Sequence, residues 1–87
     1  MHEASLITGL LSQITSIMQQ QGTGRVVGVT VKLGALSHIS PGHFREHFVY
    51  GARGTIAEGA RLTLEIGHDI GDLRAQEVVL DCIEVEE

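Results

Sequence analysis

The first two residues of the chain, Met1 and His2, carry nitrogen donors that can close around one metal ion. The α-amine of Met1, the backbone amides that follow and the imidazole of His2 are joined by short covalent links, so they can form fused chelate rings. Nitrogen donors in one plane suit Ni(II) or Cu(II), whereas zinc prefers a tetrahedral set. Glu3 could add an axial ligand or a hydrogen bond to a ligand. A histidine at position 2 is incidental in most proteins, so this pattern alone does not establish a site.

Two further histidines, His43 and His47, are four residues apart, so a helix would place them on one face. Such a pair can share a metal ion, although two ligands alone do not make a site. Zinc hydrolases of the HExxH type need a glutamate after the first histidine, and Phe44 occupies that position here. The alternative interpretation is a solvated helix face beside a core stripe of Phe44 and Phe48.

The chain offers little for catalysis beyond its histidines. His38 is expected to be a surface or capping residue, and His68 is expected to lie exposed in a loop. There is no glycine-rich phosphate loop and no nucleophile-elbow motif. The sequence therefore does not predict an enzyme.

Charge and composition exclude several classes of protein. A net charge of −5 argues against a nucleic-acid partner, and no basic cluster is present to bind an anionic membrane. No apolar run approaches the ~20 residues of a membrane-spanning helix, and no signal peptide is recognised, so we expect a cytoplasmic protein. The single cysteine, Cys82, excludes an intrachain disulfide and a zinc site built from CxxC pairs. Cys82 is expected to be buried or half-buried, as free cysteines usually are.

Two segments have the features of helices. Apolar residues recur at helical spacing over residues 4–21, and Gly22 provides a stop signal. The second helix is expected to begin with Ser40 as its N-cap and Pro41 as its first residue. It should end within residues 51–54, where two glycines occur.

Three segments alternate apolar and polar residues as strands do: residues 25–33, 61–66 and 77–87, with a loop over residues 67–76. The last alternation is imperfect, because Asp81 falls on the same face as apolar residues. Either a bulge or a strand packed on both faces would explain this pattern. Together these segments predict a single α+β domain in the order αβαββ, with two helices on one face of a small three-stranded sheet.

Four stretches of sequence combine in a specific way: MHEASL at the start, VKLGALSHISPGHF in the middle, ARGTIAEGARLTLEI after it, and CIEVEE at the end. With them, nearly the whole chain resembles the HypA/HybF family of hydrogenase nickel-incorporation proteins. The resemblance implies a small α/β nickel domain and a nickel metallochaperone that carries Ni(II) on Met1, His2 and Glu3. It also implies delivery to the [NiFe]-hydrogenase large subunit with the GTPase HypB, and in some organisms support of urease.

The chain departs from the family between the second and third strands. Typical members insert a zinc domain with paired CxxC motifs there, where this sequence has only the loop 67–76. We therefore expect residues 1–87 to form a nickel-binding HypA-like domain that holds no zinc. His38, His43 and His47 then become candidates for auxiliary nickel ligands. The alternative is a metal-free interaction domain in hydrogenase maturation, which would pair with a partner or a second copy of itself through a free strand edge.

Overall fold

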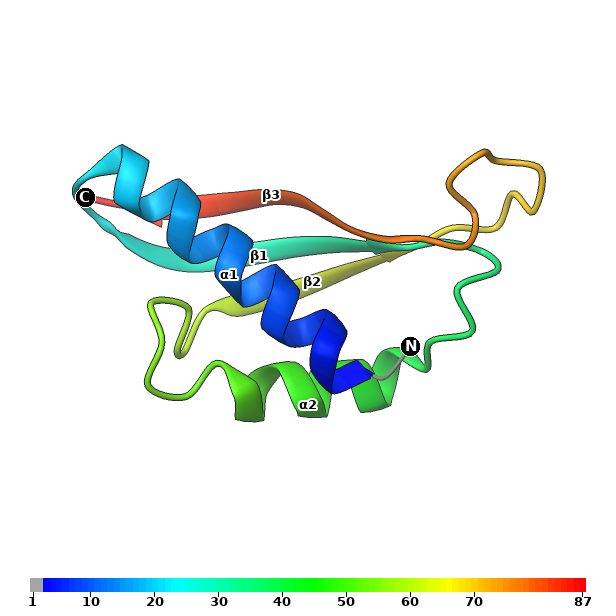
Figure 1. Cartoon of the computed structure of the whole chain (residues 1–87), viewed down its shortest axis with the longest axis horizontal. Coiled ribbons are helices and arrows are strands. Elements are labelled where there is room, and N and C mark those ends of the chain that lie inside the picture. Colours follow the sequence, from blue (N-terminus) through cyan, green and yellow to red (C-terminus); the bar gives the residue numbers. More distant parts are fainter. Residues whose placement is uncertain (1–2) are drawn as a thin grey trace.

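Two helices and three strands follow one another in the predicted order αβαββ (Figure 1). They are α1 (Glu3–Gln21), β1 (Arg25–Leu33), α2 (Pro41–Gly51), β2 (Arg61–Ile66) and β3 (Val78–Glu86). The computed structural model describes residues 3–87, so Met1 and His2 lie outside the described residues, and with them most of the predicted chelate. Within residues 3–87, neither helix is long and apolar enough to cross a membrane.

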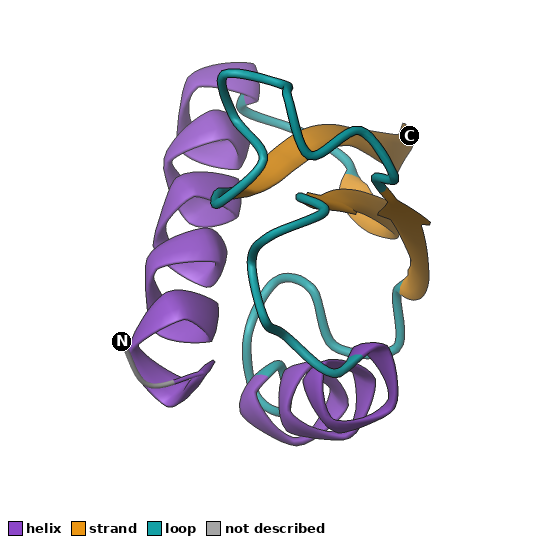
Figure 2. Ribbon diagram, turned by 90° about the vertical axis from the view of Figure 1, so that its right-hand side faces the viewer, coloured by secondary structure: helices purple, strands orange, loops and turns teal. Residues whose placement is uncertain are grey.

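β1 is the central strand of a mixed sheet with the order β2-β1-β3. β1 and β2 run parallel, because α2 and its flanking loops carry the chain back to the starting edge of the sheet. β1 and β3 run antiparallel. Both helices pack against the same face of the sheet, since side chains of β1, α1 and α2 form one buried cluster (Figures 1 and 2). The α+β prediction with two helices on one face is confirmed.

The core is aliphatic, with a local aromatic contribution from α2. Four residues of α1 are buried at helical spacing, which confirms the predicted stripe: Ile7, Leu10, Ile14 and Met18. Phe44 and Phe48 of α2 are buried beside each other, with ring centroids 6.3 Å apart. Burial of each such side chain stabilises the fold by about 1.5–3 kcal/mol.

α2 begins where the sequence places it, with Ser40 as the N-cap and Pro41 as the first helical residue. The backbone of Ser40 is extended, as an N-cap requires, but its side chain makes no capping hydrogen bond. Arg45 then ties the helix to the sheet, because its Nη1 donates a hydrogen bond of 2.8 Å to the carbonyl of Leu62 in β2. These contacts fix the exposed face of α2 relative to the rest of the domain.

β3 contains a β-bulge at Asp81, which decides between the two explanations of its irregular pattern. The register with β1 shifts here, since Leu80 lies opposite Val31 whereas Cys82 lies opposite Thr30. Leu80 therefore faces the core, and Cys82 lies exposed on the other face of the sheet. The prediction that Cys82 is buried or half-buried is wrong, because the bulge separates it from the apolar face that Leu80 occupies.

The face of the sheet away from the helices carries paired charges. Arg61 of β2 forms an ion pair with Glu84 of β3, and the pair passes over Gly28 of the central strand. A Cβ at residue 28 would collide with the Glu84 carboxylate and lie only 3.2 Å from the Arg61 guanidinium, so glycine leaves room for the pair. Lys32 and Asp81 form a second pair at 3.6 Å. Exposed pairs of this kind contribute about 0–1 kcal/mol each.

Candidate functional site

The first turn of α1 meets α2 through the side chains of Glu3 and His47. Oε1 of Glu3 lies 3.2 Å from Nδ1 of His47. The Glu3 side chain is 23% exposed and the His47 side chain 57%. Ala4 and Ile7 of α1 line a shallow groove with His47, so the imidazole sits between the two helices at the surface. This contact joins the residue beside His2 to one of the predicted auxiliary ligands.

His43 and His47 share one face of α2, as their spacing predicts. Their rings are stacked, with centroids 6.4 Å apart and an interplanar angle of 21°. Both are exposed, while Phe44 and Phe48 on the adjoining face are buried. The exposure of the two histidines and the burial of the two phenylalanines therefore agree with the interpretation as a solvated face beside a core stripe. This solvated face also makes one contact with α1, between His47 and Glu3.

His38 lies in the loop before α2, as expected for a surface residue. It is exposed, and its backbone has a left-handed φ of 58°. It borders a surface hollow lined by Leu6, Ile39 and Val78. In the part of the chain that the structure describes, no hydrogen bond joins His38 to Glu3 or His47. The structure therefore separates His38 from the contact between the two helices.

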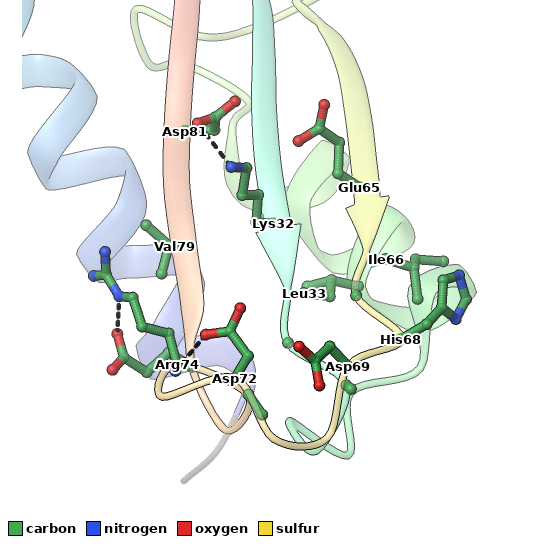
Figure 3. A pocket seen from close by; sticks show the side chains of 15 residues that line it. Lys32, Leu33, Glu65, Ile66, His68, Asp69, Asp72, Arg74, Val79 and Asp81 are labelled. Carbon is green, nitrogen blue, oxygen red and sulfur yellow. Dashed lines mark hydrogen bonds and ion pairs between the residues drawn. The ribbon is translucent and has the colours of Figure 1, made fainter.

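A pocket of about 420 Å³ lies at one end of the sheet, beside the loop 67–76 (Figure 3). Its carboxylates hold the loop together: Oδ1 of Asp69 accepts from the N–H of Gly71 at 2.9 Å, and Oδ1 of Asp72 accepts from the N–H of Arg74 at 2.8 Å. The ring of His68 points away from these carboxylates and is exposed, as predicted for this loop (Figure 3). The carboxylates of Asp69 and Asp72 are thus used in hydrogen bonds to the backbone of the loop itself.

No group of three or more His, Cys, Asp or Glu side chains suited to a metal ion occurs within residues 3–87. Glu3 and His47 alone do not make a metal site, which needs more ligands. Further donors on this side of the molecule would have to come from Met1 and His2, which are covalently joined to Glu3. The described residues alone therefore do not complete a metal site at this contact.

The sequence pattern did not reveal which histidine reaches Glu3. Spacing placed His43 and His47 on one face of α2, but the contact depends on how α2 packs against α1. A packing angle between two helices is set by many core contacts and leaves no local signal. The three auxiliary candidates were therefore equivalent until the structure separated them.

Comparison with known proteins places most of the sequence in one family. A family model described as hydrogenase/urease nickel incorporation, metallochaperone, HypA matches residues 1–82. The hydrogenase maturation factor HypA of Methylocella silvestris is 42% identical over 66 residues, which are 76% of this chain and 58% of that protein. The HypA of Lawsonia intracellularis is 40% identical over 65 residues, which are 75% of this chain and 55% of that protein. The chain thus spans less than two thirds of the length of these relatives.

The fold has a counterpart among solved structures. The solution structure of the Ni metallochaperone HypA from Helicobacter pylori matches with a TM-score of 0.82, covering 98% of this chain and 97% of that chain at 16% identity. At this identity the likeness concerns the fold alone. The family model, by contrast, matches the sequence itself from residue 1, and its description is of a metallochaperone, in keeping with the absence of catalytic motifs. The chain belongs to the HypA family of hydrogenase and urease nickel-incorporation metallochaperones.

Proposed function

We propose that this protein binds Ni(II) at Met1, His2 and Glu3 and delivers it during the maturation of [NiFe]-hydrogenase. The observation that carries the proposal is the family match, which begins at Met1 and so includes the predicted nitrogen chelate. Glu3 supports it by its place in the chain, because this carboxylate residue directly follows the two residues that carry the nitrogen donors.

Nickel is the cargo in this proposal, so the site must both bind and release it. An N-terminal chelate suits release, because a recipient can compete for its donors one at a time. By general affinity order Cu(II) would bind the same nitrogens more tightly than Ni(II). Selectivity therefore comes from metal supply and from the partner proteins rather than from the donors alone.

The partners that fit this function are the hydrogenase large subunit, which receives the nickel, and the GTPase HypB, which assists the delivery. The delivery would take place in the cytoplasm. Urease is a second recipient that fits the family description. The loop 67–76 carries no cysteine and takes the place where typical members hold a zinc domain, so residues 1–87 act as a nickel domain without bound zinc.

A metal-free interaction domain is the second candidate. The strand order β2-β1-β3 favours it, since each outer strand of the described sheet has one unpaired edge. Sedimentation of the chain with and without Ni(II) separates the two functions. Self-association that is independent of nickel, together with no nickel binding, would support the interaction domain.

The substitution His2→Ala tests the nickel proposal in a chain that keeps its native N-terminus. It should abolish tight Ni(II) binding, because the central imidazole of the chelate is lost, and leave the far-UV circular dichroism unchanged. His68→Ala is the matched control, because this histidine is exposed in a loop and makes no predicted contribution. Retained nickel affinity in the His2→Ala chain would refute the site.

A further inference from the structure

The contact between Glu3 and His47 assigns the two nitrogens of the His47 ring to different partners. Nδ1 lies 3.2 Å from Oε1 of Glu3. An ionised carboxylate only accepts hydrogen bonds, so the Glu3 carboxylate favours the ring form with the proton on Nδ1. Nε2 then carries the lone pair, and it has no hydrogen-bond partner within residues 3–87. A carboxylate on one ring nitrogen is also the usual arrangement around a histidine whose other nitrogen binds a metal.

The N-terminal chelate leaves one in-plane position to fill. The amine of Met1, the amide nitrogen of His2 and the imidazole of His2 close two fused rings and occupy three corners of a square. Ni(II) with nitrogen ligands favours four donors in a plane. A histidine nitrogen from a residue that contacts Glu3 could supply the fourth donor.

The contact between His47 and Glu3 makes His47 the candidate for that fourth corner. Only two residues precede Glu3, and they extend at most about 7 Å, so an ion bound by them stays close to the Glu3 side chain. His47 contacts this side chain directly. The centroid of the His43 ring lies 6.4 Å from that of His47. Within the described chain, neither His43 nor His38 makes a hydrogen bond to Glu3. Of the three auxiliary candidates, only His47 therefore contacts Glu3 in the described chain.

We propose that Nε2 of His47 is the fourth in-plane ligand of the nickel bound by Met1 and His2, and that the Glu3 carboxylate holds the His47 ring through Nδ1–H. This inference rests on the proposed function and makes it more specific. Glu3 is then a positioning residue and not an axial ligand. The site joins α1 to α2 when loaded, so nickel binding also ties the N-terminus to the second helix.

A Ni(II) titration of the His47→Ala chain tests the ligand assignment. We expect the affinity to fall by about tenfold or more and the d–d absorption to change, because a nitrogen ligand is replaced by water. Millimolar imidazole should restore the original absorption by occupying the vacated corner. His43→Ala is the matched control, being exposed on the same face one turn away, and it should retain both affinity and spectrum.

Unchanged nickel affinity and absorption in the His47→Ala chain would overturn the inference. The fold is not at risk in this variant, because His47 is 57% exposed and lies outside the core. A wrong assignment of His47 can be distinguished from a wrong proposal for the N-terminal nickel site. If His2→Ala abolishes binding while His47→Ala does not alter it, the N-terminal site stands and the fourth ligand is not His47.

Two substitutions of Glu3 test its positioning function. Glu3→Gln keeps an oxygen that can accept the Nδ1–H bond, so the wild-type absorption should persist with a small loss of affinity. Glu3→Ala removes the acceptor and should weaken Ni(II) binding by about 10–100-fold. A merely structural contribution would weaken binding equally in both variants, and that result would contradict the assignment.

Discussion

The α-carbon of Gly34 lies against the backbone carbonyl of Ala75 so closely that no Cβ would fit between them. Around this contact the loop 67–76 is fastened to the end of β1. The N–H of Leu36 donates to the carbonyl of Ala75 at 2.7 Å, and the N–H of Gly34 donates to the carbonyl of Glu77 at 2.9 Å. Ala75 itself is buried. The loop 67–76 is thus a packed part of this fold.

Gly34→Ala should destabilise the domain by about 1–3 kcal/mol, because the new methyl group meets backbone that cannot rotate away. Urea denaturation followed by circular dichroism measures the change. Gly42→Ala is the matched control, since a Cβ at residue 42 in α2 meets nothing within 4 Å. It should stabilise the domain by about 0.4–1 kcal/mol by restricting the unfolded chain. Equal effects of the two substitutions would contradict the proposed packing of the loop.

Phe48→Ala should cost about 3–5 kcal/mol of unfolding free energy, because it leaves a large cavity in the buried cluster between α2 and the sheet. Thermal or urea denaturation checks the value. The adjacent Val49 is 53% exposed, so Val49→Ala should change the stability by no more than about 0.5 kcal/mol. A loss of less than about 1 kcal/mol for Phe48→Ala would show that this ring is not part of the core.

The thiol of Cys82 should react with a disulfide reagent such as DTNB in the native protein about as fast as in urea. The bulge at Asp81 exposes this side chain on the open face of the sheet, so no unfolding is needed for reaction. Strong protection in the native state would mean that β3 lacks the bulge and that Cys82 packs in the core.

Regular periodicity made most of the fold predictable. The apolar stripe of α1 recurs over about three turns, from Ile7 to Met18. The structure extends the predicted helix by one residue, to Glu3. Strands β1 and β2 end where their alternation ends. In β3 the same reasoning could not choose between a bulge and two-sided packing, since both give one irregular position. The bulge at Asp81 emerges only from the pairing with β1.

The sequence indicates a candidate site only where the chemistry is local. Met1, His2 and Glu3 are neighbours in the chain, so covalent structure alone indicated the chelate, although the first two lie outside the described residues. The contact between Glu3 and His47 spans 44 positions and depends on how two helices pack. No local pattern encodes that packing, and for this reason the sequence could not separate His47 from His38 and His43.

The most direct test of the account is a Ni(II) titration that compares the native N-terminus with a chain extended by Gly-Ser-Ser-Gly before Met1. A single added residue is unsuitable, because it would place the histidine third and create a complete four-nitrogen chelate with the new amine and two amides. The longer extension keeps every side chain of the protein and removes only the α-amine from its place beside His2.

We predict that the native chain binds one Ni(II) tightly with the absorption of a square-planar nitrogen site, and that the extended chain loses both the affinity and this absorption while remaining folded. Equal affinity and identical absorption in the two chains would contradict the central claim that nickel is held by the N-terminus.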